Sequence, residues 1–161
     1  MSCSTPYQTG EQIHKRALAM AESTPPEERG KLPDGNRGSW YNPCADERHE
    51  SLIRYLMDTY ELKRFYDLGA GDLRLSVALA DDYEVVAYES LKEIATLAYE
   101  MHGEPDIELR TTDYYHHWAA MNDRKALFAA IGRTNELPSV PKNGIGVEGH
   151  DSLTVHMEAI Q

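Results

Sequence analysis

The sequence of 161 residues has two cysteines, six lysines and no long hydrophobic run. Cys3 lies at a chain end and Cys44 lies in a polar segment, so no disulfide framework is expected. No segment reaches the roughly 18 apolar residues that a membrane-spanning helix needs. The first residues also lack the basic and apolar regions of a secretory signal. These absences predict a cytoplasmic protein without membrane spans, in which the cysteines stay reduced.

Positive charge is also scarce. The 16 lysines and arginines are outnumbered by 27 acidic residues, which gives a formal net charge of −11. Dispersed acidity with little lysine is typical of proteins that work at high salt, where carboxylates keep the surface hydrated and charge is screened. A halophilic source, such as an archaeon or its virus, is one interpretation, and an ordinary acidic protein is the other. Both disfavour indiscriminate binding to nucleic acid or to anionic membranes.

The chain divides into two segments by composition. Residues 1–45 are predicted to form a helix at 10–22, capped by Thr9 or Ser4, and then an arm rich in proline and glycine. Residues 46–161 carry the pattern of one α/β domain. Its apolar content and length suit a single core.

The second segment alternates between strand and helix patterns. We expect a helix with Asp46 as its N-cap, and then strands that are separated by helices and short links. Such alternation predicts a Rossmann-like, mostly parallel sheet with flanking helices and right-handed crossovers. A C-terminal hairpin around Gly149–Ser152 would add an antiparallel edge, which could pair with another copy. The expected strands are 63–68, 84–89, 107–111 and 126–131, the helices are 46–61, 72–79 and 91–101, residues 114–122 form a helical turn, and the hairpin strands are 145–148 and 153–159.

The first strand runs into the turn Asp67-Leu68-Gly69-Ala70-Gly71. Glycine permits positive φ and a close approach of the backbone to a ligand. Glu89 ends the next strand 18 residues after Gly71, where a carboxylate can accept both hydroxyls of a ribose. Asp113 follows the third strand and borders the same crevice. A dinucleotide fingerprint would have its third glycine where Arg74 stands, so a dinucleotide loop is disfavoured.

The pattern Asp67-x-Gly69-x-Gly71, followed by Glu89 and Asp113, resembles the class I S-adenosylmethionine-dependent methyltransferases over about residues 50–132. The resemblance implies methyl transfer from S-adenosylmethionine to an acceptor that the sequence does not identify, whether small molecule, protein or nucleic acid. It assigns the methionine part to the glycine turn, the ribose to Glu89 and the adenine to Asp113. The implied cofactor-binding residues are Asp67, Gly69, Ala70, Gly71, Glu89, Asp113 and Tyr114, with Tyr41 as part of a lid.

Three departures from the family pattern favour a rival function. Leu73 stands where the family often has a small residue, which would narrow the approach to the ligand. Residues 132–138 lack the (Asp/Asn/Ser)-Pro-Pro-(aromatic) motif with which nucleic-acid amino methyltransferases hold their target, and only about 30 residues follow the fourth strand. The rival is a non-catalytic binding or assembly protein that keeps the fold, for instance in a virus or a multi-subunit complex. In the plainest alternative, the three acids merely cap helices or turns.

Other polar and aromatic residues leave two interpretations each. His116 and His117 could supply a general base, or they could belong to a polar surface turn. Trp40 and Tyr41 could close over a cofactor, or they could anchor the arm to the domain. Histidines and cysteines show no metal-binding spacing, so no metal site is expected.

Overall fold

The computed structural model describes residues 5–23, 45–132, 135–149 and 151–157. Its described strands form one sheet in the order β3-β2-β1-β4-β5-β6. The neighbours from β3 to β5 pair in parallel, and β6 pairs antiparallel with β5. The predicted Rossmann-like sheet with a C-terminal antiparallel hairpin is therefore confirmed. The strands are β1 (Arg64–Leu68), β2 (Glu84–Tyr88), β3 (Glu108–Arg110), β4 (Leu127–Ile131), β5 (Ile145–Gly149) and β6 (Leu153–Met157).

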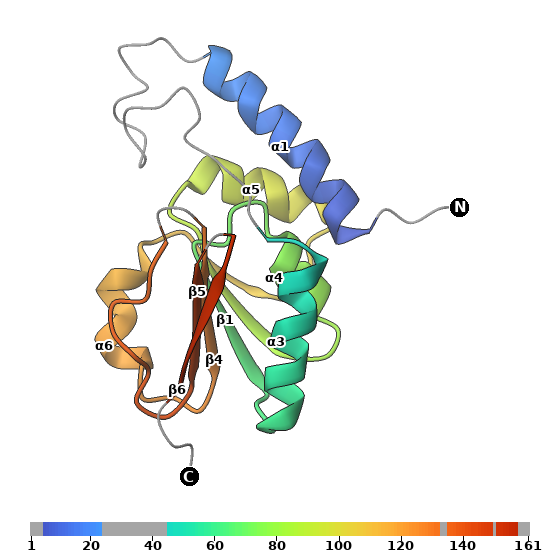
Figure 1. Cartoon of the computed structure of the whole chain (residues 1–161). Coiled ribbons are helices and arrows are strands. Elements are labelled where there is room, and N and C mark those ends of the chain that lie inside the picture. The colour runs from blue at the N-terminus through green and yellow to red at the C-terminus, as the bar shows by residue number, and fades with distance from the viewer. Residues whose placement is uncertain (1–4, 24–44, 133–134, 150, 158–161) are drawn as a thin grey trace.

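Helices cover the sheet unequally on its two faces (Figure 1). One face, called here the helical face, carries α3 (Glu47–Thr59), α4 (Arg74–Leu79) and α5 (Lys92–Met101). Of the described helices, the opposite face carries the two short ones, η1 (Tyr114–His117) and α6 (Trp118–Met121). Every residue of β4 is buried between these layers, as expected for a strand covered on both sides. None of the described helices is long and apolar enough to cross a membrane.

The helix α1 (Pro6–Ser23) packs against α4 and α5. It begins at Pro6, four residues before the predicted start, so the proposed cap Thr9 lies inside the helix, and the other proposed cap, Ser4, lies outside the described residues. Thr5 and Gln8 cap it instead, because the Thr5 hydroxyl accepts from the Gln8 N–H at 3.1 Å and the Gln8 side chain accepts from the Thr5 N–H at 2.9 Å. Proline suits the first helical position, since its missing N–H has no partner there. Ile13 is buried in the contact with the domain.

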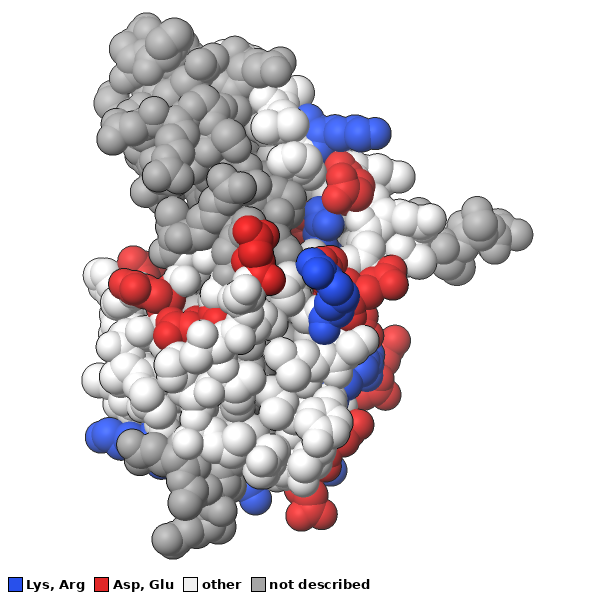
Figure 2. Space-filling view, viewed as in Figure 1, with Lys and Arg blue, Asp and Glu red and all other residues white. Residues whose placement is uncertain are grey.

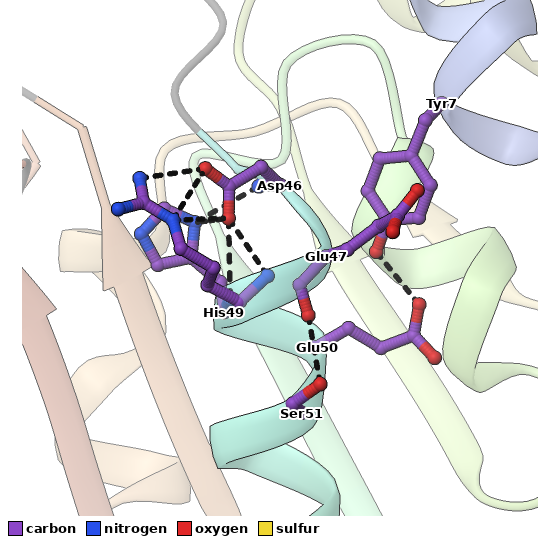
Figure 3. Close-up of polar contacts among 7 residues, drawn as sticks. Tyr7, Asp46, Glu47, His49, Glu50 and Ser51 are labelled. Atoms are coloured by element: carbon purple, nitrogen blue, oxygen red, sulfur yellow. Dashed lines mark hydrogen bonds and ion pairs between the residues drawn. The ribbon is translucent and has the colours of Figure 1, made fainter.

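Asp46 begins α3 as the sequence predicted (Figure 3). Its carboxylate accepts from the backbone N–H groups of Arg48 and His49, and the His49 ring accepts from the Asp46 N–H at 2.9 Å. This reciprocal cap satisfies amides that a free helix end would leave unpaired. One turn later, the Tyr7 hydroxyl of α1 donates to Glu50 at 2.7 Å, so α1 and α3 are joined directly.

The described part of the connection from β4 to β5 contains no helix. It packs without regular secondary structure over the opposite face, where Gly146 leaves room for Leu137. Its polar groups find partners along the way: the Leu137 N–H donates to Glu148, and Ser139 accepts from the Trp118 indole at 2.7 Å. These hydrogen bonds thus hold the connection against the sheet, on a face that a helix would otherwise cover.

Candidate functional site

The order of strands reverses between β1 and β4. In open α/β sheets, ligands bind beyond the carboxyl ends of the strands at such a reversal. Residues 67–71 lie at the end of β1, and Ile131 ends β4 beside them. The predicted glycine turn therefore occupies the place in this fold where a ligand site is expected.

The amides of the glycine turn point to β2 and not outward. The N–H groups of Gly69 and Ala70 both donate to the Tyr88 carbonyl, at 2.9 and 2.8 Å, and the Gly71 N–H donates to Glu89 at 2.8 Å. Gly69 and Gly71 both have positive φ, at 78° and 60°, which lets the chain turn this tightly. A loop that cradles phosphate needs free amides facing the ligand. In this turn the amides of Gly69, Ala70 and Gly71 are hydrogen-bonded within the protein, which disfavours a phosphate or pyrophosphate ligand.

Asp67 is a buried acid at the start of the turn. The residue is 4% exposed, and its carboxylate accepts a hydrogen bond from the Ser76 hydroxyl at 2.7 Å. Burial, helped by the nearby charges of Glu89 and Asp72 and opposed by the hydrogen bonds from Ser76, raises the pKa of this carboxyl to about 7. No cation among the described residues pairs with Asp67, so a positively charged ligand group would be stabilised beside it.

Glu89 joins the turn to the start of α5. One carboxylate oxygen accepts from Gly71, and the other accepts from the Leu91 N–H at 2.8 Å. Its side chain is buried, and burial raises its pKa. Each oxygen can still accept a second hydrogen bond, so the two backbone contacts orient Glu89 and leave capacity for ligand hydroxyls.

Asp72, in contrast, is neutralised within the protein. The Arg74 guanidinium donates to both of its oxygens, at 2.6–2.9 Å, and also reaches Glu11 of α1 at 3.1 Å. Arg74 was read from the sequence only as a missing glycine, and its structural role is this buried ion pair. Leu73 lies in the left-handed region, with φ of 65°, and packs with Ile13 on the helical face. Its side chain therefore fills the core and does not narrow the approach to the turn.

The two predicted adenine contacts occupy different environments. Asp113 is exposed and caps η1 by accepting from the Tyr115 N–H at 2.9 Å. Tyr114 is buried, and its hydroxyl donates to the Glu136 carbonyl at 2.9 Å. Tyr114 thus fixes the connection between β4 and β5 onto the opposite face. Tyr41, the predicted lid residue, and its neighbour Trp40 lie outside the described residues.

Asn135 contacts the turn, and sequence reasoning missed it. Its amide donates to the Ile131 carbonyl at 3.0 Å and to the Gly69 carbonyl at 3.3 Å, which bridges the ends of β4 and β1. The side chain fills the space that a Cβ on Gly69 would occupy. The available signal was its place four residues after the fourth strand, in the segment where the resembled family holds its acceptor.

His117 has a structural contact. Its ring lies 3.1 Å from the Tyr88 hydroxyl, which also accepts from Arg110 at 2.5 Å. Tyr88 points away from the glycine turn into the core of the opposite face, so His117 is held there too. This arrangement favours the turn interpretation for the histidine pair over a general base. Among the described residues, no group of three or more metal-binding side chains gathers at one place.

Comparison with known proteins finds likeness in structure alone. No family model and no curated protein matches the sequence. A candidate caffeoyl-CoA O-methyltransferase from Staphylococcus aureus matches 86% of the chain, with a TM-score of 0.50 and 16% identity. The chain has the class I S-adenosylmethionine-dependent methyltransferase fold. An S-adenosylmethionine-dependent O-methyltransferase from Thermotoga maritima and the 23S rRNA methyltransferase ErmE are also similar, with TM-scores of 0.48 and 0.43 and identities of 17% and 21%.

The chain is shorter than these methyltransferase-fold proteins. It matches 66% of its own length to both the Thermotoga protein and ErmE but covers only 45% and 48% of theirs. It covers 72% of the Staphylococcus protein. At such identities the likeness establishes the fold, and activity has to be argued from the site.

Proposed function

We propose that this protein is a methyltransferase that uses S-adenosylmethionine. The observation that carries the proposal is the chemistry of the glycine turn. Its amides are hydrogen-bonded within the protein, and two buried carboxylates, Asp67 and Glu89, border it without a cationic partner among the described residues. S-adenosylmethionine has a sulfonium, an ammonium group and ribose hydroxyls. Such a site suits that cationic ligand and repels a pyrophosphate.

The residues that would hold the cofactor follow from these contacts. Glu89 would accept the ribose hydroxyls, and the carboxylate of Asp67 would stabilise the positive charge of the methionine part. Gly69 lets the backbone approach closely, and Asp113 offers an exposed carboxylate for the adenine amino group. When bound, the cofactor supplies a methyl group on a sulfonium for in-line displacement. The protein then has to position the acceptor, and no strong catalytic constellation is required.

The acceptor is proposed to be a small molecule or a protein. The net charge of −11 disfavours a polyanionic acceptor at ordinary salt. The described part of the β4–β5 connection also lacks the Pro-Pro motif with which nucleic-acid amino methyltransferases hold their target amine.

A second candidate function is supported by Asn135. Its side chain lies against Gly69, in the space where close approach to the cofactor would occur. If that contact is permanent, the fold serves as a binding or assembly module without methyl transfer.

Calorimetric titration with S-adenosylmethionine and S-adenosylhomocysteine tests the proposal. We expect binding of both, and Glu89→Gln should weaken it by about 10–100-fold, because hydrogen bonds to a charged acceptor contribute about 1.5–3 kcal/mol. Glu100→Gln, an exposed change on α5, is the matched control and should bind as the parent does. Folded protein that gives no heat at millimolar ligand in high salt would refute the proposal.

Methyl transfer separates the two candidates once binding is established. Labelled S-adenosylmethionine should transfer its methyl group to a member of a pooled set of small-molecule and protein acceptors. Tight binding without transfer to any of them would favour the non-catalytic module.

A further inference from the structure

The two edges of the sheet differ in chemistry. The edge strand β3 has three residues, of which Glu108 and Arg110 are exposed and form an ion pair at 2.9 Å. The edge strand β6 has five residues, Leu153-Thr-Val-His-Met157, with no acidic, lysine or arginine side chain. Proteins normally protect edges with charge, proline or short length, because an edge offers unpaired N–H and C=O groups. Among the described residues, the β3 edge has short length and charge, and the β6 strand has neither.

Apolar side chains are exposed on the unprotected edge strand. Six large hydrophobic residues are exposed among the described residues, and two of them, Val155 (38%) and Met157 (41%), lie on β6. Figure 2 shows that the surface over β6 and the adjoining side of α3 carries few charges, with acidic and basic residues at its margins.

The side chains of β6 are complementary to those of a second β6. Register with β5 places Leu153, Val155 and Met157 on one face and Thr154 and His156 on the other. Antiparallel pairing of two copies centred on Val155 would match Leu153 with Met157, Val155 with Val155, and Thr154 with His156. Each pair is then apolar with apolar or polar with polar, which stabilises cross-strand neighbours.

We propose that two copies of this chain associate through β6, so that one sheet continues across a twofold axis. The partner is a second copy because the strand matches itself in the antiparallel direction and no like charges meet there. A twofold contact of this kind closes on itself and leaves no further edge of the same type. The inference does not depend on the proposed enzymatic activity.

Salt should strengthen this dimer. Each copy carries a net charge of −11, so two copies repel at long range although their contact strands have no acidic, lysine or arginine side chain. The screening length falls from about 10 Å at 0.1 M salt to about 3 Å at 1 M, which removes most of that repulsion. Association should therefore become tighter with salt, in contrast to a contact made of ion pairs.

Sedimentation equilibrium of the full chain at low and high salt tests the proposal. We expect a monomer–dimer equilibrium that tightens with salt. Val155→Lys and Val155→Glu should each weaken the dimer at least about a hundredfold, because like charges would meet on the axis. Thr96→Lys, an exposed change on α5, adds the same charge elsewhere and should leave the dimer intact.

Mixing the two Val155 variants tests the register. Lysine from one copy would face glutamate from the other, so the mixture should form a heterodimer that neither variant forms alone. Circular dichroism melting must show that both variants fold. A parent that stays monomeric up to millimolar concentration in both salts, dimers that persist in either variant, or a mixture that stays monomeric would each overturn the proposal.

Discussion

At the scale of single residues, the protonation of Asp67 makes the stability of the folded protein depend on pH. Its pKa of about 7 in the folded protein lies above the ordinary value, so between about pH 4 and 7 the folded state holds a proton that the unfolded state has lost. Stability from this group is therefore present at low pH and is lost as pH rises through 7. The loss between pH 5 and 8 should be on the order of 2–3 kcal/mol.

Asp67→Asn should remove that dependence, because the amide stays neutral and its oxygen can still accept from Ser76. Urea unfolding at pH 5 and pH 8 measures the free energies, and Asp106→Asn in an exposed loop is the control. The prediction fails if the Asp67 variant and the parent lose equal stability over this range.

The sequence was enough to locate the acids of the turn, but it did not reveal their burial or their hydrogen-bond partners. Spacing from the strands placed Asp67 and Glu89 at adjacent strand ends, because consecutive parallel strands end at the same edge of a sheet. Their burial, and the use of the turn amides by β2, depend on packing between distant segments. Asn135 was missed because its contact with Gly69 joins residues 66 positions apart, which no local pattern reports.

At the scale of elements, α1 docks through a contact that allows no side chain at Gly10. A Cβ there would lie 2.6 Å from Nε of Arg74, which is itself held by Asp72 and Glu11. Gly10→Ala should destabilise the protein by about 1–2 kcal/mol, although alanine is the better helix former, because overpacking outweighs helix propensity. Gln12→Ala, exposed on the same helix, should not destabilise it.

Urea unfolding gives the change in free energy, and hydrogen exchange over residues 6–23 reports whether α1 undocks. A Gly10→Ala protein more stable than its parent would show that Arg74 moves aside and that the contact is loose.

Helices and strands could be predicted from periodicity, and their ends could be predicted only in part. Asp46 was found because an N-cap residue is recognisable in sequence. The start of α4 falls two residues late, at Arg74, because Leu73 adopts the left-handed conformation that leucine rarely takes. The sparse helical cover of the opposite face was not predicted as such. The sequence indicated only that few residues follow the fourth strand.

At the scale of the whole molecule, alternation of strands and helices was enough to predict the parallel sheet and its antiparallel hairpin. It could not supply the order of the strands, which places β1 at the centre and β3 and β6 at the edges. That order decides which strand stays unpaired, and so the dimer proposed above is a property of topology more than of any motif. The division at residue 45 and the halophilic source stay predictions.

The contact of Asn135 with Gly69 has a consequence for the speed of ligand binding. If the amide must leave Gly69 before a cofactor can enter, only the open fraction of molecules is competent, and apparent affinity falls by that fraction. In stopped-flow measurements the observed rate should then level off with rising ligand concentration, at the rate of opening. Asn135→Ala should abolish this plateau and tighten binding, whereas Asn122→Ala, at α6, should keep it. A linear dependence in the parent would show that the amide is no gate.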